Sequence, residues 1–175
     1  GSEHSNSSIN NVGDETSVDG EKSSSIDKNN VSTDEANEPE EVWRKALRKE
    51  LKPKERTAIP RVQMPELDPA YRATTRLEEV NIGLTPEMAM QEAKRCLDCP
   101  KPTCVEGCPV GIHIPDFIKH IEHGDFLQAA SILKETSALP AVCGRVCPQE
   151  KQCESRCIHL KMNSPAVAIG YLERF

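Results

Sequence analysis

The chain has 175 residues and a formal net charge of −6, which allows one folded domain with a tail. Residues 1 to 40 hold ten acidic residues and two lysines, so the remaining chain carries a net charge of +2. That remainder has no block of basic residues, which argues against nucleic-acid binding, and no apolar run long enough to span a membrane. We expect a cytoplasmic protein without structural disulfides.

Residues 1–40 are rich in serine, asparagine and acidic side chains, with only scattered apolar residues. Such a segment cannot bury enough surface to offset its chain entropy, so it is predicted to be a disordered acidic tail. Gly1-Ser2 is interpreted as an expression scar.

Residues 41–84 are predicted to form an amphipathic helix followed by an extended arm. The helix, over 41–52, places Trp43, Ala46, Leu47 and Leu51 on one stripe and ends at Pro53. The arm, over 53–84, contains four prolines and shows no sustained hydrophobic period.

Residues 85–175 are predicted to form an all-α domain. Helices are expected over 85–97, 115–123, 126–135, 148–158 and 166–174, from their capping residues and apolar spacing. The stretch 100–111 is expected to be an irregular loop, because it is rich in proline and glycine. No alternating strand pattern is present, so the fold class is all-α.

All eight cysteines lie between residues 96 and 157, in two groups. A cysteine followed by proline occurs in each group, at Cys108-Pro109 and Cys147-Pro148. Such runs wrap cubane iron–sulfur clusters, and the fourth cysteine of a run can serve the neighbouring cluster. Cys96, Cys99 and Cys104 fit one local set, which leaves Cys108 for a second cluster.

Two other uses of the cysteines remain open at this point. Eight thiols could form two structural zinc sites, which would make the chain a zinc-stabilised interaction module without redox activity. A disulfide framework is the third possibility, although nothing in the sequence indicates export.

The sequence resembles the N-terminal α-helical ferredoxin domain of the glutamate synthase small-subunit family. That family includes dihydropyrimidine dehydrogenase and the large subunit of NADH-dependent ferredoxin:NADP oxidoreductase. The motifs that carry the resemblance are EAKRCLDCPKPTC at 92–104, GCPVGIHIPDFI at 107–118, LPAVCGRVCPQEKQCESRC at 139–157 and PAVAIGYLERF at 165–175.

The resemblance implies two [4Fe–4S] clusters, each bound by both cysteine groups. The first cluster would take Cys96, Cys99, Cys104 and Cys157. The second would take Cys108, Cys147, Cys153 and, as an oxygen ligand in the last helix, Glu173.

The resemblance also implies an electron-transfer domain of an FAD- and NAD(P)-dependent oxidoreductase. Its partners would be the flavin and nicotinamide domains of the parent chain, and a glutamate synthase large subunit or a ferredoxin-reductase subunit. The glycine-rich phosphate loop of the flavin domain does not occur here, so we expect one non-catalytic domain of a longer enzyme. The spacing between Cys147 and Cys153 is longer than in small subunits that serve an amidotransferase.

Several residues beside these motifs have open roles. Cys143 is expected to be a buried apolar side chain rather than a ligand. His113, His120, His123 and His159 show no ligand spacing, and His120 and His123 are expected to face solvent. Arg145 and Lys151 could offset negative cluster charge or lie on an ordinary surface.

Overall fold

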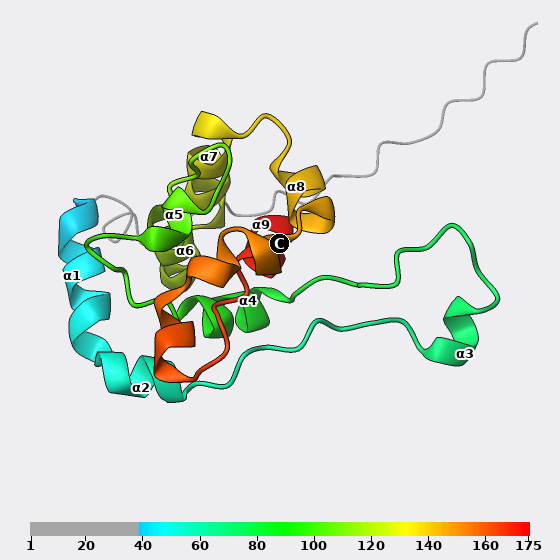
Figure 1. The fold of residues 1–175 in the computed structure, drawn as a ribbon, viewed down its shortest axis with the longest axis horizontal. Helices are drawn as coiled ribbons and strands as arrows, with labels where there is room; N and C mark the ends of the chain where they lie inside the picture. The colour runs from blue at the N-terminus through cyan, green and yellow to red at the C-terminus, as the bar shows by residue number, and fades with distance from the viewer. Residues whose placement is uncertain (1–38) are drawn as a thin grey trace, which may run out of the picture. The chain divides into compact units, whose positions relative to one another are not determined.

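The computed structural model describes residues 39–175, which form one unit of helices and short turns (Figure 1). The acidic tail expected over 1–40 lies, up to residue 38, outside the described residues. The α-helices are α1 (Glu40–Glu50), α2 (Pro53–Ala58), α3 (Pro69–Arg72), α4 (Pro86–Ala93), α5 (Thr103–Glu106), α6 (Ile114–His123), α7 (Phe126–Thr136), α8 (Pro140–Val146) and α9 (Ile169–Arg174). Three 3₁₀ turns are η2 (Gln149–Lys151), η3 (Glu154–Arg156) and η4 (Ile158–Met162).

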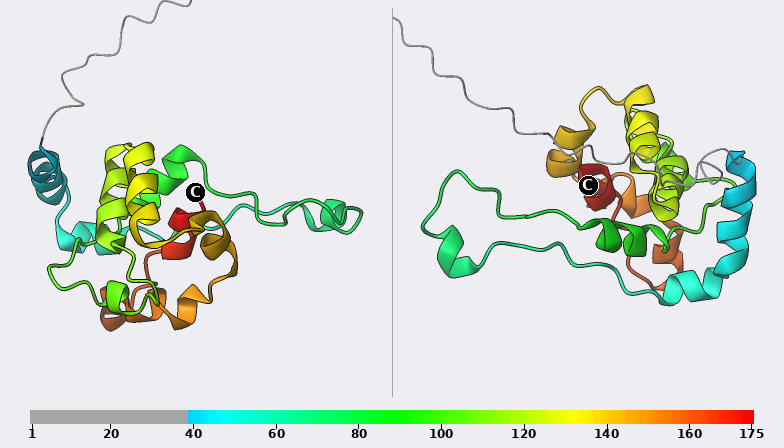
Figure 2. Two further views of the ribbon diagram at one scale, coloured as in Figure 1. Left: turned by 90° about the horizontal axis from the view of Figure 1, so that it is seen from above. Right: turned by 180° about the vertical axis from the view of Figure 1, so that it is seen from behind.

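The all-α class is confirmed over residues 39–175, where the only β-type pairing is one isolated antiparallel bridge between Glu66 and Asn81. This bridge joins the two sides of the predicted arm, which is a long hairpin. Both Figure 1 and Figure 2 show the hairpin running out from the helices, with α3 near its far end. In this described part no helix is long and apolar enough to cross a membrane.

The hydrophobic core is built around α6, whose Phe117, Ile118 and Ile121 are at most 2% exposed. Helix α6 packs on α7 and α4, and α8 packs on α9. Gly124 ends α6 in a left-handed conformation with φ 88°, which glycine adopts at little cost. Trp43 attaches α1 to this core by stacking on His123 at a centroid distance of 4.4 Å.

Two predicted helices near the cysteines are shorter than expected. The helix expected over 85–97 ends at Ala93, so Cys96 lies in the turn that follows it. The helix expected over 166–174 begins only at Ile169. Its first residues stay extended because the buried pair Glu92 and Arg95 hydrogen-bonds the backbone there, at Pro165, Ala166 and Ala168.

Other local predictions also need correction. The stretch 100–111 is not wholly irregular, because α5 forms one turn after Pro102. The expected helix over 148–158 is two separate 3₁₀ turns, η2 and η3. Helix α8 was not predicted at all, and its seven residues with an internal glycine are too few for a clear hydrophobic period.

Candidate metal centre

Four cysteines surround one cavity, which we call the first cavity. They are Cys96, Cys99, Cys104 and Cys157. Cys96 and Cys99 lie in the turn after α4, Cys104 lies in α5, and Cys157 lies between η3 and η4. Apolar side chains form most of the rest of the wall, among them Ile114, Ile118, Val167 and Ile169, and the lining also includes Thr103, Arg156 and His159. Sulfur donors in an apolar cage fit a buried thiolate-bound metal group.

The second cavity is surrounded by four cysteines and one carboxylic acid. These residues are Cys108, Cys143, Cys147, Cys153 and Glu173. Cys143 and Cys147 come from α8 and its end, and Glu173 comes from α9, which packs against α8. The second cavity therefore offers five possible ligands, one more than a tetrahedral set of cluster corners needs.

The two cavities are built from the same two short segments. Cys104 faces the first cavity and Cys108 the second, on either side of the end of α5. Cys153 and Cys157 flank η3 in the same manner. The segments approach closely at Gly107, where a Cβ atom would lie 2.8 Å from the Gln152 carbonyl oxygen. Each segment thus sends one thiol to each cavity, which makes the two cavities neighbours.

Burial raises the pKa of several thiols in both cavities, namely Cys96, Cys99, Cys104, Cys147 and Cys153. Burial raises the pKa of Cys96 to about 11, while the charge of Lys119 opposes the shift. Burial, together with neighbouring thiol charges, raises the pKa of Cys104 to about 12. Burial also raises the pKa of Cys153 to about 12, with the Glu154 charge acting in the same direction. A metal group would replace these protons, because thiolate is the ligand form.

Glu173 has the properties of a carboxylate that lacks its partner. The residue is 9% exposed, and its Oε1 atom is buried without any hydrogen bond. Burial raises the pKa of the carboxyl group to about 7. Buried polar atoms are nearly always hydrogen-bonded, so an oxygen without a partner here fits a group that binds a cation. Its position beside Cys108, Cys147 and Cys153 fits a metal ligand.

The donors surround a volume rather than converge on a point. Among residues 39–175, no three cysteine, histidine or acidic side chains come close enough to hold a single metal ion. A zinc ion needs four thiolates about 2.3 Å from one centre, whereas a cubane cluster separates its ligands across a larger body. The arrangement fits a cluster better than a lone ion. All eight cysteines are outside disulfides, so a disulfide framework is not formed.

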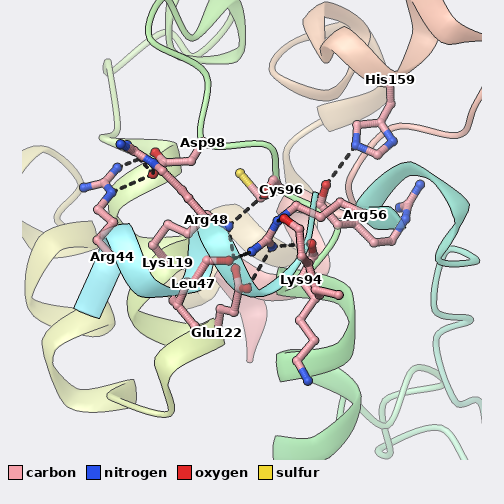
Figure 3. A network of polar contacts seen from close by, with 12 residues as sticks. Arg44, Leu47, Arg48, Arg56, Lys94, Cys96, Asp98, Lys119, Glu122 and His159 are labelled. Carbon is pink, nitrogen blue, oxygen red and sulfur yellow. Dashed lines mark hydrogen bonds and ion pairs between the residues drawn. The ribbon is translucent and has the colours of Figure 1, made fainter. Parts of the chain in front are cut away.

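Buried side chains fix the backbone that leads into the first cavity (Figure 3). Three consecutive carbonyl groups after α4 each accept a hydrogen bond from a side chain that is at most 3% exposed. The pairs are Arg56 Nη1 to the Lys94 oxygen at 2.6 Å, His159 Nε2 to the Arg95 oxygen at 2.9 Å, and Lys119 Nζ to the Cys96 oxygen at 2.8 Å. These carbonyls follow directly after the C-terminal end of α4, where cationic side chains such as Arg56 and Lys119 are stabilising. Glu122 joins Arg56 and Lys119 from the other side.

The sequence also led to expectations for two histidines, Cys143 and Arg145, and the structure agrees with only some of them. His120 was expected to face solvent, which is wrong, because it is 5% exposed and packs edge-on against Trp43. His123 is exposed and stacks on the same ring. Cys143 is only partly buried, and its Sγ lies 3.9 Å from the Ser137 hydroxyl. Arg145 pairs with Glu79 at 2.9 Å, so its charge is largely offset there.

Sequence reasoning missed the charged residues that support the first cavity. Arg56, Lys119 and Glu122 are buried, although their residue types usually indicate solvent-exposed helix faces. Asp98 lies within the first cysteine motif, but no role was predicted for it. Its position between two candidate ligands, Cys96 and Cys99, indicates a residue that orients them.

Comparison with known proteins agrees with this geometry. Residues 72–175 match the family model described as dihydropyrimidine dehydrogenase domain II, 4Fe-4S cluster. UacF, a candidate oxidoreductase of Escherichia coli K12, is 44% identical over 107 residues, which are 61% of this chain and 17% of UacF. The small chain of NADPH glutamate synthase from Halomonas elongata is 39% identical over 113 residues, which are 65% of this chain and 24% of that protein.

A third relative is subunit PreT of the NAD-dependent dihydropyrimidine dehydrogenase of Escherichia coli O157:H7. It is 41% identical over 99 residues, which are 57% of this chain and 24% of PreT. The chain thus spans no more than about a quarter of the length of these relatives. Because the family model covers more than half of the chain, the protein belongs to the family of 4Fe–4S cluster domains typified by domain II of dihydropyrimidine dehydrogenase and shared by glutamate synthase small subunits.

Proposed function

We propose that the chain binds two [4Fe–4S] clusters and relays single electrons through them. One observation supports the proposal above all. The segments around α5 and η3 each contribute a cysteine to both cavities, and each cavity has at least four potential ligands. Two clusters held by the same short segments lie close together, which suits rapid transfer between them. Cys96, Cys99, Cys104 and Cys157 would bind the first cluster.

For the second cluster, the proposed ligands are Cys108, Cys147, Cys153 and Glu173. Glu173 is preferred over Cys143 because its buried oxygen has no partner, whereas the Cys143 thiol lies within hydrogen-bonding distance of Ser137. A carboxylate ligand would give this cluster a reduction potential different from that of an all-thiolate cluster.

The domain would serve a longer oxidoreductase that uses FAD and NAD(P). The names of the glutamate synthase small chain and PreT support nicotinamide-dependent chemistry and a subunit partner. A flavin accepts a two-electron hydride and releases single electrons, which the clusters would carry to a partner subunit or a second site. A glutamate synthase large subunit or a ferredoxin-reductase subunit would be such a partner, in the cytoplasm.

Iron and acid-labile sulfide analysis of anaerobically prepared chain tests the proposal. We expect about eight irons and eight sulfides per chain, with a brown colour that dithionite bleaches. A colourless chain with stoichiometric zinc would overturn the proposal and favour a structural interaction module. About four irons would limit the chain to one cluster.

A further inference from the structure

The turn between Cys96 and Cys99 contains a backbone conformation that needs support. Asp98 has a φ of 51°, in the left-handed region that glycine adopts readily and aspartate or asparagine only occasionally. The residue is also 5% exposed, so its carboxylate is removed from bulk water. A buried charge in an uncommon backbone conformation persists only when its surroundings hold it there.

Two arginines of α1 hold this carboxylate (Figure 3). Arg44 donates from Nε to Oδ2 at 2.8 Å and from Nη2 to Oδ1 at 2.6 Å, which is a two-pronged contact. Arg48, one helical turn later, donates from Nε to Oδ2 at 2.7 Å. Charge-assisted, two-pronged bonds of this kind are among the strongest and most directional in proteins.

Helix α1 is itself fixed to the body of the domain. Arg44 also pairs with Asp116 of α6 at 2.7 Å, and Trp43 packs against His120 and His123 of the same helix. The arginines therefore connect the Cys96–Cys99 turn to a rigid part of the core. Yet α1 lies before residue 72, outside the part of the chain that matches the family model.

We propose that α1 is a positioning element of the first metal centre, in which Arg44 and Arg48 fix Asp98 and thereby the directions of Cys96 and Cys99. The inference rests on the proposed function. Cys99, Asp98 and both arginines also line one surface groove, so the arginine charges lie beside the cluster that these cysteines would bind. Positive charge next to a cluster favours its reduced form.

The test is the double variant Arg44→Gln, Arg48→Gln in the reconstituted 175-residue chain. Half of the iron should be released to a chelator about 10 to 100 times faster than in the wild type, the usual effect of losing residues that orient metal ligands. One of the two reduction potentials should become more negative, and the other should stay unchanged. Arg72→Gln is the matched control, because Arg72 pairs with Glu66 on the exposed hairpin.

A second double variant separates geometry from charge. Arg44→Lys, Arg48→Lys keeps both charges but loses the planar fork, so the potential should return toward the wild-type value while iron release stays fast. Arg48→Gln alone should act in the same direction more weakly, because its side chain is 49% exposed, and it remains informative if the double variant does not fold.

The outcomes distinguish this inference from the function on which it rests. If the wild-type chain holds both clusters, but the glutamine double variant has the same iron-release rate and reduction potentials, the inference is wrong and the proposed function stands. Equal acceleration of all the iron would also overturn it, since that result indicates general loosening. Wild-type chain that takes up zinc and no iron would overturn both.

Discussion

The two cavities of this domain differ in how many ligands they offer and in how they are enclosed. The first has four thiols in a largely apolar wall, and the buried cationic side chains of Arg56 and Lys119 bind the backbone that leads into it. The second has four thiols and a carboxylic acid, and it adjoins α8, whose Val142 and Val146 are 49% and 70% exposed.

This difference gives two distinct environments for the two proposed clusters. The first cavity has no spare thiol or carboxylate, so the surrounding protein must set the position and the charge environment of its ligands. In the second cavity a fifth group is within reach, so the choice of ligand can itself set the properties of the site. The following predictions test this contrast, from the largest expected effect to the smallest.

Cys157→Ser should abolish the first cluster, because the first cavity contains no fifth thiol or carboxylate to replace the lost thiol. The iron content should fall from about eight to about four per chain or fewer. Cys143→Ser, in the second cavity, is the matched control and should keep all the iron. Full iron content in the Cys157 variant would show that this thiol is not a ligand.

Glu92→Gln should destabilise the iron-loaded domain by about 3–5 kcal/mol, the usual cost of breaking a buried ion pair. Glu92 is fully buried, and its two oxygens accept from Arg95 and from the Val62 and Ala168 backbone amides. An amide nitrogen at either position would face another donor. Chemical unfolding measures the change, and the exposed Glu66→Gln variant should cost less than about 1 kcal/mol.

Gly144→Ala should loosen the second cavity while sparing the first. A Cβ atom at this position would lie 2.5 Å from the Arg174 backbone nitrogen, so α8 and α9 would have to separate. Overpacking of this kind costs about 1–3 kcal/mol. Iron release to a chelator should accelerate for half of the iron only. Gly111→Ala, where a Cβ atom meets nothing within 4 Å but φ is +64°, controls for backbone strain alone.

Glu173→Cys should keep both clusters and change a single reduction potential. The substitution would replace the proposed oxygen ligand by sulfur, and would so make the ligand set of the second cavity resemble that of the first. Redox titration followed by visible absorbance measures both potentials. Potentials identical to those of the wild type would contradict the assignment of Glu173 as a ligand.

Glu79→Gln should have the smallest effect, because Glu79 pairs with Arg174 and Arg145 on the surface. Hydrogen bonds from these arginines lower the pKa of Glu79 below its usual 4.5. The ion pairs of Glu79 with the two arginines therefore stabilise the fold above pH 4.5. This contribution is lost as the pH falls through the lowered pKa of Glu79. Wild type and variant should converge in thermal stability under acidic conditions. A difference that grows on acidification would contradict this account.

The cysteine pattern predicted clusters, and the resemblance to a ferredoxin-domain family implied which residues bind each one. Each implied ligand set lines one of the two cavities, and Cys143 lines the second cavity as well. The amphipathic pattern predicted α6 within one residue of its observed bounds, because an apolar stripe with helical spacing is typical of a helix that packs on the core. Such signals are local, so a single sequence contains them.

The supporting charges could not be predicted in the same way. Arg56 lies in a segment without hydrophobic period, yet it is 3% exposed because four groups, three carbonyls and the distant Glu122 carboxylate, converge on its guanidinium. Likewise, Arg95 is fully buried, because its guanidinium donates hydrogen bonds to the carbonyl oxygens of Pro165 and Ala166. Contacts between residues far apart in the chain leave no periodic pattern in the sequence.

The bond between His159 and the Arg95 carbonyl spans 64 residues and has a consequence for biosynthesis. Chain growth at about 5–20 residues per second places roughly 3–13 seconds between the emergence of these two partners. During that interval Cys96, Cys99 and Cys104 have left the ribosome while Cys157 has not. The first cavity is therefore completed only after Cys157 has emerged, and until then its earlier thiols lack their fourth partner and are open to oxidation unless the surroundings are reducing or a chaperone shields them.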